Sequence, residues 1–185
     1  MQQEPCWLVT ARLSATTCSR LAVSPEQQPF VAVTAQRAEN NSTIFLPDGS
    51  SVEVPSAALD AANPELQDDL DDIGKLSHLN EACLFHLIAT RYLVGRHIYT
   101  SAGPVLVALN PFTPQPALYS TSKLEAYQRH SAAADGSSAE PHVFALAATA
   151  FQGLVSRGVS QSIAINGESG AGKVCEPGRE SASLD

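Results

Sequence analysis

The residues best suited to do chemistry lie near the end of the sequence, where an apolar run enters a glycine-rich turn that ends in a lysine. The run is Ile163-Ala164-Ile165, and the turn follows as Asn166-Gly167-Glu168-Ser169-Gly170-Ala171-Gly172-Lys173. Glycines at this spacing let successive backbone N–H groups point inward around an anion, and the lysine reaches toward the β- and γ-phosphates of a nucleotide. The pattern predicts a phosphate-binding loop after a strand; the alternative is a chance glycine-rich turn.

The position after the lysine departs from this pattern. A complete phosphate loop has Ser or Thr there, whose hydroxyl binds Mg²⁺, and this sequence has Val174. Pro177 and Gly178 then oppose the helix whose N-terminus should lie behind the phosphates. We therefore expect half of a nucleotide site, followed by an unrelated tail over residues 174–185.

Composition excludes several other classes of function. The net charge of −8 argues against nucleic-acid binding through a basic face, and no apolar stretch is long enough to be a membrane-spanning segment. The four cysteines and five histidines show no paired spacing, so we expect reduced thiols in a cytoplasmic protein and no metal site.

The first part of the chain predicts a small β module. Residues 1–29 are expected to be irregular apart from a possible short strand at Trp7–Val9. Over residues 30–58, Val31 and Val33 alternate with small residues, and Pro47-Asp48-Gly49-Ser50 predicts a hairpin turn between the β-rich runs Thr43–Leu46 and Val52–Val54. Residues 61–72 form an acidic linker.

The second part alternates helices and strands. Helical spacing predicts a helix over residues 81–93, with Asn80 as N-cap and Gly95 after its end. A hairpin is expected over residues 97–110, and its continuously apolar run Val105–Leu109 predicts a strand buried on both faces. Prolines then favour an extended loop that leads to Tyr119.

Two further helices are expected before the glycine-rich turn. One is short, over residues 123–128, and a surface loop follows over residues 130–139. The other has Pro141 in its first position, an apolar stripe that includes Phe144 and Phe151, and Gly158 as its end. The chain as a whole therefore predicts a mixed α/β fold.

At this point the sequence resembles the myosin motor domain. The segments that carry the resemblance are Leu76–Glu81, Arg91-Tyr92, Ile98–Thr100, Leu106–Phe112, Pro141–Ala147 and Gln161-Ser162-Ile163 leading into Gly167–Lys173. Their order and spacing are far more specific than any one of them. The resemblance covers residues 60–173, and residues 30–58 are more weakly similar to the SH3-like barrel of that family. Ala62-Asn63-Pro64 and the acidic linker look most like plant-type or algal myosins.

The resemblance implies an actin-activated ATPase of the cytoplasm and cytoskeleton, with ATP and Mg²⁺ as ligands and actin filaments as partner. The phosphate loop, Gly167 to Lys173 with Val174, would wrap the phosphates. The segment that begins at Asn110 would hold the adenine, with Asn110 and Tyr119 as polar contacts; the alternative for Tyr119 is a packing aromatic. This fold would be the N-terminal part of a P-loop NTPase domain.

Where the sequence departs from the family, other hypotheses stay open. Residues corresponding to the family's two switch segments and its actin-binding surface are not found in this sequence. We expect an N-terminal fragment of a motor that cannot complete ATP hydrolysis or bind actin alone, so whether the chain is an enzyme stays open. The alternatives are a catalytically dead binding module, a mis-spliced product with an intron-derived tail from Val174, and a small P-loop kinase or GTPase.

Overall fold

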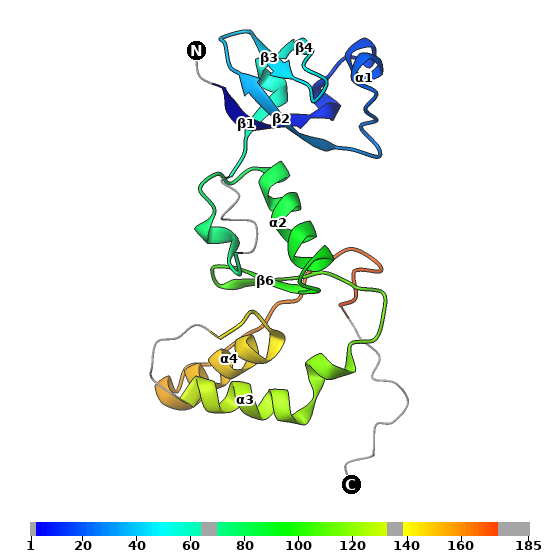
Figure 1. Ribbon diagram of the computed structural model, residues 1–185. Helices are drawn as coiled ribbons and strands as arrows, with labels where there is room; N and C mark the ends of the chain where they lie inside the picture. Colours follow the sequence, from blue (N-terminus) through cyan, green and yellow to red (C-terminus); the bar gives the residue numbers. More distant parts are fainter. Residues whose placement is uncertain (1–2, 64–69, 133–138, 174–185) are drawn as a thin grey trace. The chain divides into compact units, whose positions relative to one another are not determined.

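The computed structural model describes residues 3–63, 70–132 and 139–173, with the side chains of residues 130–132 left out (Figure 1). It divides into two compact units, Met1–His97 (unit 1) and Ile98–Asp185 (unit 2). Strands and helices occur in both, so the mixed α/β prediction is confirmed. None of the helices in the described ranges is long and apolar enough to cross a membrane.

Unit 1 is built on an antiparallel sheet with the strand order β4-β3-β2-β1-β5 (Figure 1). The strands are β1 (Glu4–Val9), β2 (Phe30–Gln36), β3 (Asn41–Phe45), β4 (Ser51–Pro55) and β5 (Leu59–Ala61). A short helix, α1 (Ala15–Leu21), lies between β1 and β2 in the sequence, and Ser14 caps it by accepting the N–H of Thr17. The predicted β strands within residues 30–58 are therefore present.

The prediction that the first residues are irregular is wrong for β1. This strand begins at Glu4, before the short strand expected at Trp7, and it lies inside the sheet with β2 on one side and β5 on the other. Cys6 is opposite Val33 of β2 and Ala61 of β5. Pairing on both edges satisfies the backbone of β1 through residues distant in sequence, which local patterns do not reveal.

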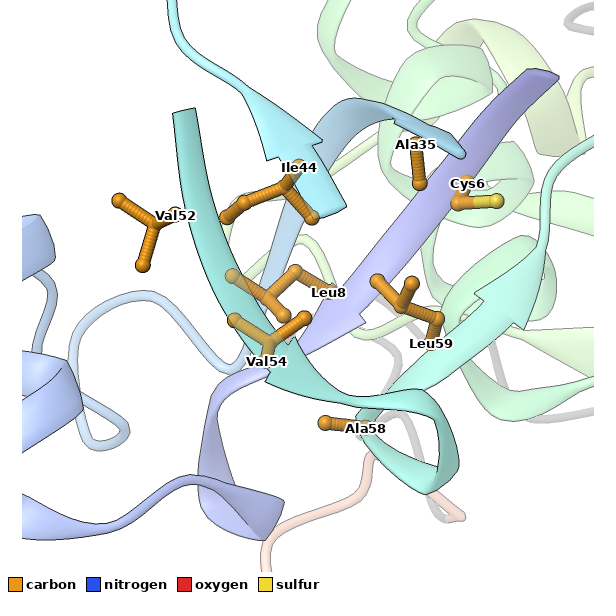
Figure 2. Close-up of a cluster of buried hydrophobic side chains, with 8 residues drawn as sticks. All are labelled: Cys6, Leu8, Ala35, Ile44, Val52, Val54, Ala58 and Leu59. Carbon is orange, nitrogen blue, oxygen red and sulfur yellow. The ribbon is translucent and has the colours of Figure 1, made fainter. Parts of the chain in front are cut away.

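The core of unit 1 is a cluster of buried apolar side chains that every strand helps to form (Figure 2). In β4 the side chains alternate, with Val52 and Val54 buried and their neighbours exposed, as expected for a strand with one face on a core. Leu8 and Ile44 are among its largest fully buried side chains. The cluster comprises Cys6, Leu8, Ala35, Ile44, Val52, Val54, Ala58 and Leu59.

The predicted turn between β3 and β4 is confirmed. The N–H of Leu46 donates to the Ser50 carbonyl at 2.9 Å, and Gly49 has a φ of +84° that favours glycine. The Asp48 carboxylate accepts from the backbone N–H and the hydroxyl of Ser50, and these bonds lower the pKa of Asp48. Side-chain and backbone chemistry therefore fix this hairpin locally.

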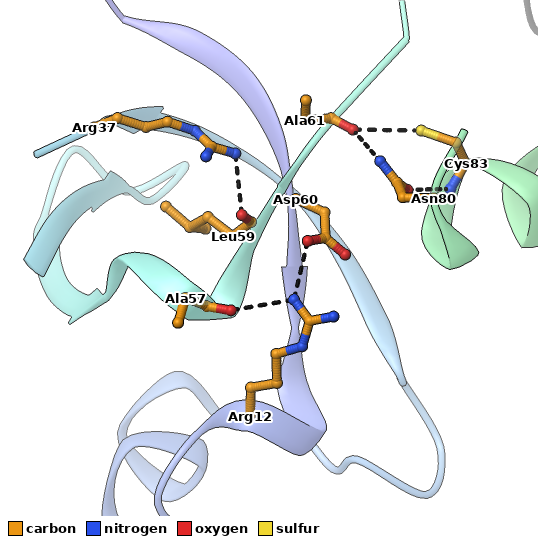
Figure 3. A network of polar contacts seen from close by, with 8 residues as sticks. All are labelled: Arg12, Arg37, Ala57, Leu59, Asp60, Ala61, Asn80 and Cys83. Carbon is orange, nitrogen blue, oxygen red and sulfur yellow. Dashed lines mark hydrogen bonds and ion pairs between the residues drawn. The ribbon is translucent and has the colours of Figure 1, made fainter. Parts of the chain in front are cut away.

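Helix α2 (Glu81–Leu93) begins and ends where the sequence predicts. The Oδ1 atom of Asn80 caps it by accepting the N–H of Cys83 at 2.9 Å. Figure 3 shows that Asn80 Nδ2 and Cys83 Sγ both donate to the Ala61 carbonyl at the end of β5. These bonds join the helix start to the sheet. The same position buries the Cys83 thiol, and burial raises its pKa.

Two arginines bind β5 and the residues just before it, close to the start of α2 (Figure 3). Arg12 Nη1 donates to the Ala57 carbonyl at 3.1 Å and to the Asp60 carboxylate at 2.9 Å, and Arg37 donates to the Leu59 carbonyl. The three described cysteines, Cys6, Cys18 and Cys83, are free thiols, as expected.

Unit 2 opens with a hairpin of β6 (Tyr99–Ala102) and β7 (Val105–Ala108), which turns through Gly103. The hairpin prediction is confirmed, but the prediction that the second strand is buried on both faces is wrong. Val105 is 60% exposed, and within the described residues β7 pairs with β6 alone. An apolar run is buried only where neighbouring elements cover it.

Two helices, α3 (Thr121–Ala132) and α4 (Val143–Arg157), pack side by side in unit 2 (Figure 1). α3 is longer than predicted and takes in part of the expected surface loop, of which residues 133–138 lie outside the described residues. α4 begins two residues after Pro141 because His142 caps it, and Gly158 ends it with a φ of +64°, as predicted.

The strand predicted at Ile163–Ile165 is absent. These residues pair with no strand in the part of the chain that the structure describes, and Ile163 and Ile165 are 51% and 67% exposed. Strand geometry depends on a neighbouring strand to accept and donate backbone hydrogen bonds. Val174 and the expected tail over residues 174–185 lie outside the described residues.

Candidate phosphate-binding site

The residues predicted to hold phosphate, Gly167–Lys173 (here the phosphate loop), form a tight curl. The N–H of Ala171 donates to the Glu168 carbonyl at 3.1 Å. Gly170 and Gly172 on either side of it both have a φ of +81°, which only glycine adopts without strain. Alternation of glycines in the left-handed region with other residues is how a backbone makes a concave anion site.

Lys173 folds back over the loop. Its Nζ atom donates to the carbonyls of Gly167 and Glu168, each at 2.8 Å. The stem of the side chain passes beside Gly167, where an added Cβ would be in ordinary contact with Lys173 Cγ at 3.4 Å but would crowd Ala171 Cβ at 3.0 Å. A glycine at 167 therefore leaves room for the Ala171 side chain inside the curl.

Asn110 contacts the loop from sixty residues away in the sequence. Its Nδ2 atom donates to the Gly170 carbonyl at 2.9 Å. A Cβ on Gly172 would lie 3.3 Å from Asn110 Cγ, so the amide also packs against the second glycine of the curl. The structure therefore joins Asn110 to the phosphate loop, a contact that the sequence did not predict.

Tyr119 lies in an aromatic cluster rather than on the loop. Its hydroxyl is 2.7 Å from the hydroxyl of Tyr99, and its ring centre is 5.9 Å from His142 and 6.3 Å from Phe144. The side chain is 42% exposed, so part of the ring is open to solvent. These contacts fit either role that the sequence left open, a packing aromatic or one wall of a pocket.

His142 is the main residue of this region that sequence reasoning missed. It is 3% exposed, its Nδ1 accepts the N–H of Phe144 at 3.0 Å, and its ring stacks on Tyr127 at 5.0 Å. The other nitrogen, Nε2, is buried and has no hydrogen-bond partner among the described residues. A polar residue directly before an apolar helical pattern was the available signal, since such residues cap helices.

The surroundings of His142 favour the neutral form of its ring. Burial lowers the pKa of His142, the charge of Lys123 lowers it further, and the nearby Glu140 carboxylate opposes this shift. The pKa of Tyr127 is raised by burial and then by Glu140, whose backbone carbonyl accepts the Tyr127 hydroxyl at 3.1 Å. A neutral imidazole can accept the N–H of Phe144, whereas a protonated one has no free acceptor.

The phosphate loop suits an anion better than a metal ion. Across residues 3–63, 70–132 and 139–173 no group of three or more His, Cys, Asp or Glu side chains could hold a metal. The loop offers one carboxylate, Glu168, and position 174 carries no hydroxyl. An ammonium group on a curled glycine backbone is instead the donor set that phosphate binds.

Comparison with known proteins gives one consistent family. The family model for the myosin head (motor domain) matches residues 70–178, more than half of the chain. Myosin-1 of Arabidopsis thaliana is 46% identical over 132 residues, which is 71% of this chain and 11% of that protein. Myosin-3 of the same plant is 44% identical over the same share.

A more distant organism gives the same result. The myosin-J heavy chain of Dictyostelium discoideum is 38% identical over 126 residues, which is 68% of this chain and 5% of that protein. The chain therefore spans about a tenth or less of the length of these curated relatives.

Proposed function

The chain belongs to the myosin head (motor domain) family, and from this premise we propose that it contributes the phosphate loop of an ATP site. The observation that carries the proposal is the curl at Gly170 and Gly172, with the Lys173 ammonium folded over it. Backbone and ammonium donors in this arrangement complement the charge of a nucleotide's phosphates. Loop residues Glu168 and Ser169 would contribute through their backbone N–H groups, and Ala171 would hold the curl through its N–H bond to the Glu168 carbonyl.

On the base side of the site, we propose that the segment from Asn110 to Tyr119 faces adenine. Tyr119 supports this assignment because its partly exposed ring offers a flat apolar surface beside a hydroxyl. Asn110 belongs to the same segment and reaches the phosphate loop, so one segment would serve both ends of a nucleotide.

Hydrolysis by this chain alone is not part of the proposal. Magnesium, if bound, would supply the positive charge that neutralises the phosphates during phosphoryl transfer. Val174 cannot ligate it, and the described residues of the loop do not supply a replacement cluster. We propose nucleotide binding without turnover by these residues.

For the whole protein, the family supports a role as an actin-based motor of the cytoskeleton. Actin and a cytoplasmic location are proposed for that larger protein rather than for the residues described, because the chain corresponds to about a tenth or less of its relatives. The sheet of unit 1 is proposed to be the family's small SH3-like module.

A second candidate is a binding module without nucleotide chemistry. The observation in its favour is the closed core of unit 1, whose strands all contribute buried side chains independently of the phosphate loop. Loss of the metal-binding hydroxyl at position 174 is compatible with the same candidate.

A titration calorimetry experiment with ATP separates the two candidates. We expect the purified chain to bind ATP with an affinity that Mg²⁺ changes little, and Lys173→Met to weaken binding by about 10-fold or more, since a hydrogen bond to a charged group contributes about 1.5–3 kcal/mol. Lys75→Met is the matched control, because Lys75 pairs with Asp71 in unit 1. Absence of ATP binding, or equal binding by Lys173→Met, would favour the binding module.

Phosphate release, with and without actin filaments, is the second measurement on the same protein. We expect no turnover above the background in either condition. Sustained release that depends on Mg²⁺ would contradict the proposal that these residues bind without hydrolysing.

A further inference from the structure

We infer that Asn110 is a positioning residue whose side-chain amide sets the shape of the phosphate loop, so that it acts on phosphate binding through the loop and not through the base. The identity of the ligand rests on the proposed function, whereas the effect on loop shape does not. The inference is carried by the contacts of Asn110 with Gly170, Gly172 and Phe112.

The amide uses both of its ends. Nδ2 donates to the Gly170 carbonyl at 2.9 Å, and Oδ1 accepts the N–H of Phe112 at 2.9 Å. An amide held at its oxygen has its nitrogen aimed in a fixed direction, because the two atoms share one plane. The bond to Phe112 therefore orients the bond to Gly170.

The bond from Phe112 to Asn110 also accounts for an unusual backbone conformation. Phe112 has a φ of +52°, a conformation that costs about 1–3 kcal/mol for a residue with a side chain. Its ring is 85% exposed, so packing of the ring does not maintain that conformation. The side chain of Asn110 closing a turn two residues long is the contact that favours it.

On the loop side, the contact falls at the most demanding point of the curl. The Gly170 carbonyl belongs to the first of the two residues with a φ of +81°, and a Cβ added at the second, Gly172, would lie 3.3 Å from Asn110 Cγ. Movement of the amide would therefore release a hydrogen bond and a packing contact together. Since the loop is otherwise exposed to solvent, we expect Asn110 to limit its motion.

The test on the unliganded protein is solvent exchange of the Ala171 amide, measured by NMR. Asn110→Asp keeps an oxygen for Phe112 but replaces the Nδ2 donor by an oxygen that repels the Gly170 carbonyl. We expect exchange at Ala171 to become about three- to ten-fold faster, the range for loss of one hydrogen bond. Exchange of the α4 amides reports whether the variant is folded. If Asn110→Asp changes exchange in α4, the test is repeated with Asn110→Ser, whose side chain is too short to reach Gly170.

Asn63→Asp is the matched control. Asn63 forms an equivalent pair of bonds in unit 1, in which Nδ2 donates to the His78 carbonyl and Oδ1 accepts the His78 N–H. The same chemical change there should leave exchange at Ala171 as it is. Equal exchange at Ala171 in wild type, Asn110→Asp and Asn110→Ser would overturn the inference.

Binding of inorganic pyrophosphate and of ADP then locates the effect. If Asn110 acts through the loop, Asn110→Asp weakens both ligands by the same factor, about three- to ten-fold. Weaker ADP binding with unchanged pyrophosphate binding would instead place Asn110 on the base and overturn the inference. If the wild type binds neither ligand, the proposed function fails, and the exchange measurement alone decides the role of Asn110.

Discussion

The sheet of unit 1 and the helical part of unit 2 differ in how completely they cover their own apolar side chains. In the sheet, Leu8 and Ile44 are no more than 1% exposed. On α4, Phe151 and Val155 are 65% and 66% exposed, and Ile165 after it is 67% exposed. The candidate site is therefore carried by the less covered unit, so its shape depends on local bonds more than on a core.

The cause lies in backbone pairing. Each interior strand of the sheet has a neighbour on both sides, so its apolar face is held over a common core. In the described part of unit 2 the hairpin of β6 and β7 is a sheet of its own. No strand precedes the phosphate loop in the described residues, so hydrogen bonds such as those from Asn110 to Gly170 and from Lys173 to Gly167 hold its shape instead.

The largest expected effect compares one leucine from each region. Leu8→Ala should lower the free energy of unfolding of unit 1 by about 2–5 kcal/mol, because it leaves a cavity in a closed core. Leu154→Ala on α4 removes the same atoms from a side chain that is 49% exposed, so a loss below about 1.5 kcal/mol is expected. Urea titration followed by the NMR amide signals of each unit measures both free energies of unfolding. Equal losses would show that the two leucines are equally well covered, contrary to what the structure predicts.

A smaller effect is expected on the pH dependence of stability, which should differ between the two units. Because burial lowers the pKa of His142 below the ordinary 6.5, the unfolded chain takes up the proton more readily than the folded one. The contribution of neutral His142 is therefore fully present above pH 6.5 and is lost as the pH falls below it. We expect acid to shift the urea midpoint of unit 2 in that window.

The matched variant for this prediction is His142→Asn. Asparagine can still cap α4 but does not titrate, so the acid shift attributable to residue 142 should disappear while the helix is kept. A wild-type midpoint for unit 2 that stays constant between pH 7.5 and about 5 would contradict the assignment of a neutral, buried imidazole.

The smallest effect is expected from the exposed apolar side of α4, where Phe151 is 65% exposed. Phe151→Ser should change the free energy of unfolding of unit 2 by no more than about 1 kcal/mol, because most of the ring is already in solvent. The same change should raise the concentration at which the chain begins to self-associate, as followed by light scattering, since exposed apolar patches promote association. Unchanged scattering would mean that this face does not drive association.

Local features were predictable from the sequence, and distant ones were not. Helix α2 was predicted to the residue because its cap at Asn80 and its apolar spacing lie within the segment itself. Strand β1 was missed over its first residues because its stability comes from pairing with β2 and β5. The strand expected at Ile163–Ile165 was wrong for the same reason, since an apolar run alone does not supply a partner.

In the candidate site, too, local features were predictable from the sequence and distant contacts were not. Glycine spacing was enough to predict the curl at Gly170 and Gly172, because positive φ is a property of single residues. The bond from Asn110 to Gly170 joins residues sixty apart, and His142 is buried by rings from several segments. Both depend on tertiary structure, which no short pattern encodes.

The single tryptophan of the chain gives the two units separate optical signals. Trp7 is in unit 1, with its ring centre 4.9 Å from that of His86 on α2. Tyr99, Tyr119 and Tyr127 are in unit 2, leaving one tyrosine, Tyr92, in unit 1. The fluorescence of Trp7 should therefore report whether β1 and α2 are packed together. The absorbance of the tyrosines should report mainly the folding of the unit that carries the phosphate loop, and neither measurement needs an added dye.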